Sequence, residues 1–195
     1  MSQVSSDEDR GGPLVVVLGL LAADAPGRVM GAPEDWPRWA VLLPHVLAAT
    51  GHFKHFPGPQ EQPGRHDASW LLDRAATYLQ VHARLAEARP LAERALAITE
   101  AAYGPGHPAV GAALNNLALI WRDLGEPGTA RPLAERALAI TEAAYGPDHP
   151  TVGILRANLT ALIHEIDHGA STAGGTSPEG HQPGRGAEGD PDGGP

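Results

Sequence analysis

The chain has 195 residues and contains no cysteine, which excludes disulfides, thiolate nucleophiles and cysteine-ligated zinc sites. Its formal net charge is −9, and an acidic chain without a Lys/Arg cluster repels a phosphate backbone, which argues against nucleic acid as a partner. The 24 glycines and 19 prolines crowd the N-terminal third and the residues after 168, so we expect a packed part of only about 100 to 130 residues.

Residues 1–34 are predicted to be a disordered or remnant N-terminal segment, and residues 1–12 are polar and acidic. The longest apolar run, PLVVVLGLLAA over 13–23, is about half as long as a membrane helix, and the acidic flank before it does not suit an export signal. We expect this run to form a buried strand or a short helix that does not enter a membrane. The lack of cysteine fits a cytoplasmic protein.

Residues 35–66 are predicted to form a short helix followed by a Gly/Pro-rich loop. The helix should begin near Asp35, because Pro37 then lies in its first turn, where a missing N–H has no cost. Pro44 is expected to kink this helix or to end it early. The composition of residues 51–64, GHFKHFPGPQEQPG, is that of a loop.

Apolar residues spaced by three and four after Asp67 predict a series of amphipathic helices. Glycine followed by proline at 104–105 and again at 146–147 should end two of them. Asp148 is predicted to be the N-cap of the last one. Residues 169–195 have almost nothing to bury and are predicted to be a disordered tail. The helices expected from these signals cover residues 67–79, 85–103, 107–124, 128–145 and 150–167.

A string of 21 residues occurs twice in this region. Residues 88–108, ARPLAERALAITEAAYGPGHP, return at 130–150 with a single change, and the offset is 42 residues. A tandem repeat of this length indicates units that stack on one another, because no unit can bury its apolar face alone. We therefore expect a repeat domain over 67–168, with units at about 68–109 and 110–151 and a terminal helix over 150–167.

The pattern inside each unit resembles the tetratricopeptide repeat. Residues of the second unit are spaced as in the motif W-x-x-L-G-x-x-Y, with Leu for Trp, Ala for Gly and Trp for Tyr: Leu114, Leu117, Ala118 and Trp121. Small residues follow where that family places its turn glycine and its close helix contacts: Gly125, Ala130, Ala134 and Ala137. In the third unit, Arg156 and Thr160 replace an apolar and a small residue, as expected if this helix caps the stack and faces water.

This resemblance implies an all-α fold, a short right-handed solenoid of α-hairpins with disordered termini. The period of 42 and the strings LNNLA and YGPDHP resemble the kinesin-light-chain-like branch of the family. In such stacks the first helices of the units line a concave groove that takes an extended peptide or a partner helix. By position, the resemblance places the following residues in that groove: Asp73, Thr77, Asn115, Leu119, Arg122 and Asp123.

A second resemblance covers residues 35–51, DWPRWAVLLPHVLAATG, and the helices that follow. It is to the C-terminal half of actinobacterial proteins that join an NB-ARC nucleotide-binding domain to tetratricopeptide repeats. The chain contains no GxxxxGK[ST] sequence and hence no phosphate cradle. The alternative function is therefore a regulatory or sensor fragment of an NB-ARC-type signalling NTPase that lacks its nucleotide-binding domain.

The sequence HEIDH at 164–168 satisfies H-E-x-x-H, a spacing that puts two imidazoles on one face of a helix for zinc. A metzincin-like third ligand is missing, because Ser171 and Gly174 stand where glycine and histidine are required. A zinc hydrolase is therefore a distant alternative, and we expect no metal, no cofactor and no enzymatic activity.

The function predicted is that of a non-catalytic scaffold for protein–protein interaction, with a protein or peptide as partner. Because about three units are the minimum for a stable stack and the third is incomplete here, we expect a marginal fold that gains stability from a partner or from self-association.

Overall fold

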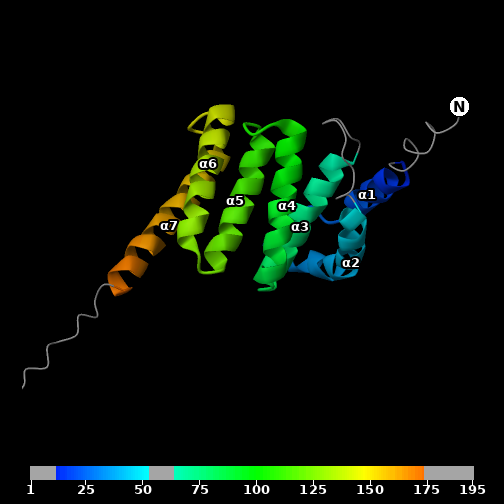
Figure 1. Cartoon of the computed structure of the whole chain (residues 1–195), viewed down its shortest axis with the longest axis horizontal. Helices are drawn as coiled ribbons and strands as arrows, with labels where there is room; N and C mark the ends of the chain where they lie inside the picture. Colours follow the sequence, from blue (N-terminus) through cyan, green and yellow to red (C-terminus); the bar gives the residue numbers. More distant parts are fainter. Residues whose placement is uncertain (1–11, 53–63, 174–195) are drawn as a thin grey trace, which may run out of the picture.

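A computed structural model of the chain describes the backbone of residues 12–52 and 64–173, and the side chains as far as residue 168. Within these ranges every regular element is a helix, which confirms the all-α prediction. The elements follow one another along the chain in this order (Figure 1): α1 (Gly12–Asp24), η1 (Pro33–Asp35), α2 (Trp36–His52), α3 (Arg65–Val81), α4 (Leu85–Tyr103), α5 (Pro108–Asp123), α6 (Pro127–Tyr145) and α7 (Pro150–Ala173).

From α3 onward the helices form two hairpins, α3/α4 and α5/α6, and α7 packs beside α6 at the end of the stack (Figure 1). This is the right-handed α-hairpin solenoid that the repeat predicts. The second helix of each hairpin ends at a tyrosine, and the glycines that follow, Gly104 and Gly146, have φ angles of 83° and 85°. Only glycine adopts this geometry without strain, so the duplicated Gly-Pro pair ends both helices at the same point of the repeat.

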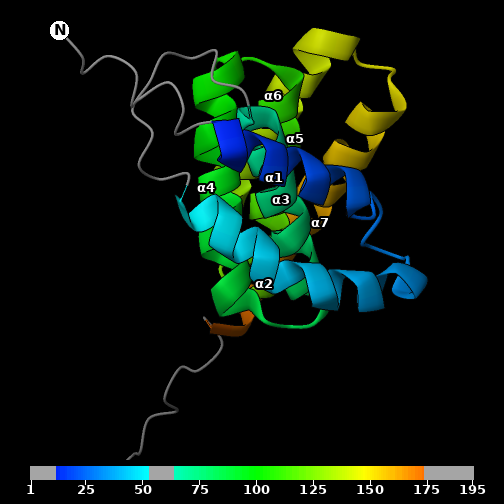
Figure 2. The same cartoon turned by 90° about the vertical axis from the view of Figure 1, so that its right-hand side faces the viewer.

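Residues 12–34 are ordered, and the apolar run at 13–23 is helical, which is one of the two forms expected for it. The apolar run forms α1, in which Leu18 is completely buried, and the chain after it buries Val29 and Ala32. α1 packs against both α2 and α3 (Figure 2). The alternative of disorder does not hold for 12–34, because the first hairpin gives this run a surface to cover, and that the segment is a remnant stays a prediction; residues 1–11 lie outside the described residues. None of the described helices combines the length and the hydrophobicity needed to span a membrane.

α2 is longer than the sequence predicts, because Pro44 does not end it. The helix continues from Trp36 to His52. Pro44 is exposed, so its ring faces solvent. What the helix loses at this position is the one backbone hydrogen bond that proline cannot donate. On the opposite side Trp39 is completely buried, and its indole Nε1 donates to the backbone oxygen of Pro26 at 3.1 Å. Burial of this large aromatic side chain offsets the cost of the proline.

Two arginines at equivalent places of the repeat, Arg94 and Arg136, tie each second helix to the helix that precedes its hairpin. Arg136 forms a salt bridge with Glu100 at 2.7 Å and donates to the backbone oxygen of Pro105 at 3.3 Å. Arg94 donates to the backbone oxygen of Thr50 near the end of α2, and burial lowers the pKa of its guanidinium. α2 therefore supplies the first hairpin with the contact that α4 and its following turn supply to the second.

His107 and His149 act as N-caps of α5 and α7. The Nδ1 atom of each accepts the backbone N–H of the residue two positions further on, at 3.2 Å in both cases. Each ring also stacks on the tyrosine that ends the preceding helix, with centroids 4.7 Å apart for Tyr103 and 4.8 Å apart for Tyr145. The prediction that Asp148 caps the last helix is wrong, because the neighbouring imidazole satisfies the orphan backbone donor.

The helices of the second hairpin approach closely at Gly111. A Cβ atom at this position would lie 2.8 Å from Thr141 Oγ1 and 3.3 Å from the backbone oxygen of Ala137. Ala137 and Ala118, the small residues that the repeat motif places between helices, are both buried. Small side chains therefore set the distance between the helices here.

α7 forms the C-terminal end of the stack. Toward the hairpin before it, this helix buries Val152, Leu155 and Leu162. Arg156 and Thr160 are exposed, as expected for a helix that caps the stack. The backbone of α7 continues to Ala173, beyond the helix end predicted at 167, and 174–195 lie outside the described residues.

Candidate functional site

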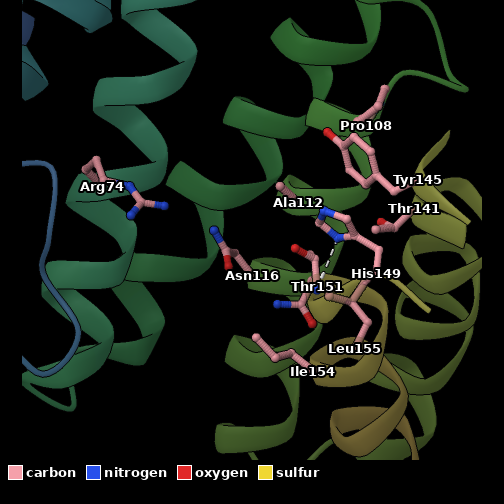
Figure 3. A pocket seen from close by; sticks show the side chains of 11 residues that line it. Arg74, Pro108, Ala112, Asn116, Thr141, Tyr145, His149, Thr151, Ile154 and Leu155 are labelled. Carbon is pink, nitrogen blue, oxygen red and sulfur yellow. Dashed lines mark hydrogen bonds between the residues drawn. The ribbon is translucent and has the colours of Figure 1, made fainter. Parts of the chain in front are cut away.

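Two hollows follow one another along the face formed by the first helices α3, α5 and α7. The hollow between α3, the end of α4 and α5 has a volume of about 300 Å³. The hollow between α5, the end of α6 and α7 has a volume of about 520 Å³ (Figure 3). Arg74 and Ala112 line both, so the two form one continuous surface, which we call the first-helix groove. These volumes lie in the range of protein sites that take small ligands or side chains.

Side-chain hydrogen bonds between three pairs of residues link the first helices across this face, and the members of each pair are 43 positions apart. Asn116 donates to both carboxylate oxygens of Asp73, at 2.9 and 3.1 Å, and connects α5 to α3. Asn158 donates to Asn115 at 3.2 Å and connects α7 to α5.

The third pair is joined by a hydrogen bond from the Gln80 amide to the carboxylate of Asp123, at 2.6 Å. Since the sequence repeat is 42 residues, each first helix meets the next one with a stagger of one residue. The same contact register is thus kept along the whole stack.

The charges in the first-helix groove are largely paired within it. Arg74 forms a salt bridge with its neighbour Asp73 and also donates to the backbone oxygen of Gly27 at 3.4 Å. Further along, Arg122 pairs with Asp123 at 3.1 Å. All four of these charged side chains keep between 15% and 32% of their surface exposed, so each can still contact a ligand.

The Tyr–His stacks form one edge of the first-helix groove. Tyr103 and His107 line the smaller hollow, and Tyr145 and His149 line the larger one. Because Nδ1 of each cap histidine accepts a backbone N–H, the neutral ring carries its proton on Nε2, which leaves that atom as a donor. At the other end, His66 Nδ1 lies 2.9 Å from the Tyr103 hydroxyl. This edge offers aromatic faces and single hydrogen-bond donors at the spacing of the repeat.

Residues 67–143 match a family model described as tetratricopeptide repeat. The matched residues run from the first turn of α3 to the last turn of α6, so the two hairpins are the part of the chain that is similar to tetratricopeptide repeats. The structure is also similar to the crystal structure of BtubC (BKLC) from P. vanneervenii, with a TM-score of 0.56 and 17% sequence identity, over 85% of this chain and 68% of that chain. No curated protein sequence matches the chain. The similarity to BtubC concerns the fold alone.

Tetratricopeptide repeats generally mediate protein–protein interaction, and solenoids of this kind are typically non-catalytic scaffolds. The resemblances to the kinesin-light-chain-like branch and to NB-ARC proteins stay predictions.

Most of the residues that the sequence analysis predicts for the groove lie in the first-helix groove or next to it. Asp73 and Asn115 line the two hollows, and Leu119 and Arg122 line a narrow crevice next to the larger one. Asp123 takes part in the bond from Gln80 described above. That these residues bind a partner stays a prediction.

Thr77 does not belong to the accessible groove, so this part of the site prediction is wrong. Its side chain is only 7% exposed, and its hydroxyl donates to the backbone oxygen of Asp73 at 2.9 Å. The residue lies on the side of α3 that packs into the core. A β-branched threonine that bonds the carbonyl four residues earlier has no donor left for a ligand.

The sequence analysis did not identify several residues that line the groove, among them Arg74, Ala112 and Asn116 on the first helices. Asn115 and Asn116 follow Ala112 by three and four residues, so helical periodicity places these three residues of α5 on one face. Alignment of the units also puts Arg74, Asn116 and Asn158 at one repeat position. Arg74 and Asn116 directly follow the predicted residues Asp73 and Asn115, so including these neighbours and the residue one turn before Asn115 would have found all three.

The HEIDH sequence lies on α7, outside the two hollows of the first-helix groove, and all of its residues except Ile166 are exposed. The rings of His164 and His168 stack with centroids 3.8 Å apart, as their spacing on one helix face predicts. Among the residues that the structure describes, no group of three or more His, Asp and Glu side chains could hold a metal ion. Two imidazoles without a third ligand are not a catalytic zinc site, so the zinc-hydrolase alternative gains no support.

Proposed function

We propose that this chain is a non-catalytic scaffold that binds an extended peptide, or one helix of a partner protein, in the first-helix groove. The observation that carries the proposal is the continuity of the two hollows, which share Arg74 and Ala112 and run along successive first helices. A long, open surface suits a chain-like ligand better than a compact substrate, because it offers contacts at regular intervals.

The chemistry of the groove suits a peptide backbone. The amides of Asn115, Asn116 and Asn158 can each donate and accept, so they retain capacity for a ligand beside the bonds that they make between helices. Apolar contacts are also available, because Ile154 at the margin of the larger hollow is 60% exposed and Tyr145 is 51% exposed. Side chains of a peptide would pack there, while its backbone bonds the asparagines.

A substitution at Ala112 tests this proposal without disturbing the core. Ala112 is exposed, lies in the interior of α5 and lines both hollows, so Ala112→Arg should fill the groove at its centre. Ala139, exposed on the second helix α6, lines neither hollow and gives the matched control Ala139→Arg. Both changes add the same charge and volume to a helix.

The measurement is selection of binding peptides from a random display library with the wild-type chain, followed by titration of the selected peptides. We expect Ala112→Arg to weaken binding at least tenfold, a loss of about 1.4 kcal/mol, and Ala139→Arg to leave it unchanged. Peptides that bind the two variants equally well would place the binding surface elsewhere and overturn the proposal. Failure of a deep library to yield any binder would also count against it.

A further inference from the structure

The N-terminal helix α1 is apolar around its whole circumference, although only one side of it is covered. Leu18 faces inward and is completely buried. On the outer side Val16, Val17 and Leu20 are 60%, 44% and 65% exposed. A helix that is apolar on all sides is normally covered on all sides. The outer side of α1 therefore lacks a partner within the part of the chain that the structure describes.

The outer side of α2 continues this apolar surface. α1 and α2 both pack on α3 and contact each other, so their exposed sides face away from the repeats together (Figure 2). We call this surface the N-terminal apolar face. Its exposed apolar residues are Pro13, Val16, Val17, Leu20 and Ala23 from α1, and Pro37, Ala40, Val41, Pro44, Leu47 and Ala48 from α2.

Few polar groups interrupt this face. Asp24 and Arg38, the exposed charges of α1 and α2, form a salt bridge with each other. Within these two described helices the other exposed polar side chains are His45 and His52. Covering the face would thus bury little unpaired charge, which is the main penalty for closing an apolar surface.

The opposite end of the stack is built differently. The outer side of α7 presents Arg156, Thr160, His164 and Glu165, all of them exposed. Terminal units of a repeat stack need a polar outer side to stay in water. α7 meets this requirement and α1 with α2 does not. Contact of one stack with the other end of a second stack would place polar groups against apolar ones, so a head-to-tail filament is disfavoured.

We propose that the N-terminal apolar face is the interface of a homodimer in which two copies meet head to head about a twofold axis. A twofold contact pairs this face with itself, so apolar side chains meet apolar side chains and the assembly closes at two copies. The proposal concerns a surface separate from the first-helix groove, and it does not depend on what that groove binds.

The size of the face indicates how tightly two copies associate. Helices of 13 and 17 residues are about 20 and 25 Å long, and side by side they cover a width of about 20 Å. The projected area is on the order of 400 Å², which is small compared with the roughly 800 Å² per partner of a standard stable interface. We therefore expect a reversible dimer with a dissociation constant in the micromolar range.

Sedimentation velocity of the full chain over a series of concentrations from about 1 to 200 µM tests the proposal. The wild type should shift from monomer to dimer across this range. Leu20→Glu should raise the dissociation constant at least about tenfold, because it puts an unpaired charge into the contact. Ile154→Glu is the matched control, since Ile154 has a similar exposure of 60% but lies on α7, and it should leave the dimer intact.

A second measurement protects the test against a variant that fails to fold. The chain contains no cysteine, so a single spin label can be attached at Leu20→Cys or at Ile154→Cys without further changes. Electron–electron distances between copies should be short for the label on α1 and long for the label on α7. A chain that stays monomeric at all concentrations, a dimer that tolerates Leu20→Glu, or a short distance for the α7 label would each overturn the proposal.

Discussion

Replacing Gly111 with alanine tests whether the close approach of α5 and α6 is a real constraint on the fold. Alanine has a higher intrinsic helix propensity than glycine, by about 1 kcal/mol, so the substitution would stabilise an unconstrained helix. At this position, however, the new Cβ atom would lie 2.8 Å from Thr141 Oγ1. Thr141 is 3% exposed, and its hydroxyl already donates to the backbone oxygen of Ala137 at 2.8 Å. A stiff, buried, hydrogen-bonded side chain cannot move aside cheaply.

The repeat supplies an internal control for the magnitude. Gly153 occupies the equivalent position 42 residues further on, at the same distance from the start of α7, and a Cβ atom there would meet nothing within 4 Å. The propensity gain is the same for both substitutions, so their difference isolates the steric cost. Overpacking of this kind costs about 1–3 kcal/mol. We expect Gly153→Ala to stabilise the chain by up to about 1 kcal/mol and Gly111→Ala to be less stable than it by about 1–3 kcal/mol.

Urea unfolding followed by circular dichroism measures both values, and the slope m shows whether the transition stays comparable between variants. The double variant Gly111→Ala, Thr141→Ala gives a further check, because removing the hydroxyl and methyl groups of Thr141 makes room for the new Cβ atom. The cost of Gly111→Ala should then fall by at least about 1 kcal/mol in that background. Ser69 occupies the position of Gly111 in the first unit, 42 residues earlier. If Gly111→Ala stabilises the chain as much as Gly153→Ala does, the second hairpin can relax to a helix spacing that admits a Cβ atom, as the first hairpin does at Ser69, and the close approach is no constraint.

Three further predictions follow from single contacts. His149→Ala should destabilise the chain by about 1 kcal/mol in urea unfolding because α7 loses its N-cap, whereas Asp148→Ala should change stability by less than about 0.5 kcal/mol. The hydrogen bond from Arg84 lowers the pKa of the Glu87 carboxyl from 4.5, so its small stabilising effect is present above pH 4.5 and is lost as the pH falls through the lowered value; acid unfolding of Glu87→Gln should lack this contribution. Purified protein should contain no equimolar zinc by elemental analysis, and zinc that disappears with His164→Ala would restore the hydrolase hypothesis.

The repeat region could be predicted from the sequence because its signals are local. Glycine and proline end α4 and α6 at fixed points, and the apolar residues recur at helical spacing between these stops. The predicted helix over 85–103 agrees with α4 at both ends. Once two units are recognised as copies, stacking is the only arrangement that buries the apolar side of each, so the fold class follows without any long-range information.

The packing of the N-terminal part could not be predicted because it depends on contacts with distant residues. The apolar run of α1 and the Val29 side chain are buried against helices that the sequence gives no reason to place there. The sequence predicts that Pro44 kinks α2 or ends it early, but whether it ends the helix depends on whether its ring faces solvent, and the burial of Trp39 on the other side decides that. The placement of Thr77 also depends on packing, because successive residues of α3 point in different directions and a difference of one position separates the groove side of the helix from its core side.

The contacts explain why the duplicated 21 residues have stayed so similar while the first helices differ. Positions 99 and 141 both hold a buried threonine that bonds the carbonyl four residues earlier, and positions 103 and 145 both hold a tyrosine that stacks on a cap histidine. The threonine bonds lie within the second helices, and the tyrosine–histidine stacks join each hairpin to the helix that follows it. Across the first helices the same alignment pairs Arg74 with Asn116 and Asp73 with Asn115, and all four line the groove. The duplication therefore preserves packing within and between the units, and these groove positions that differ from one unit to the next lie in the first helices.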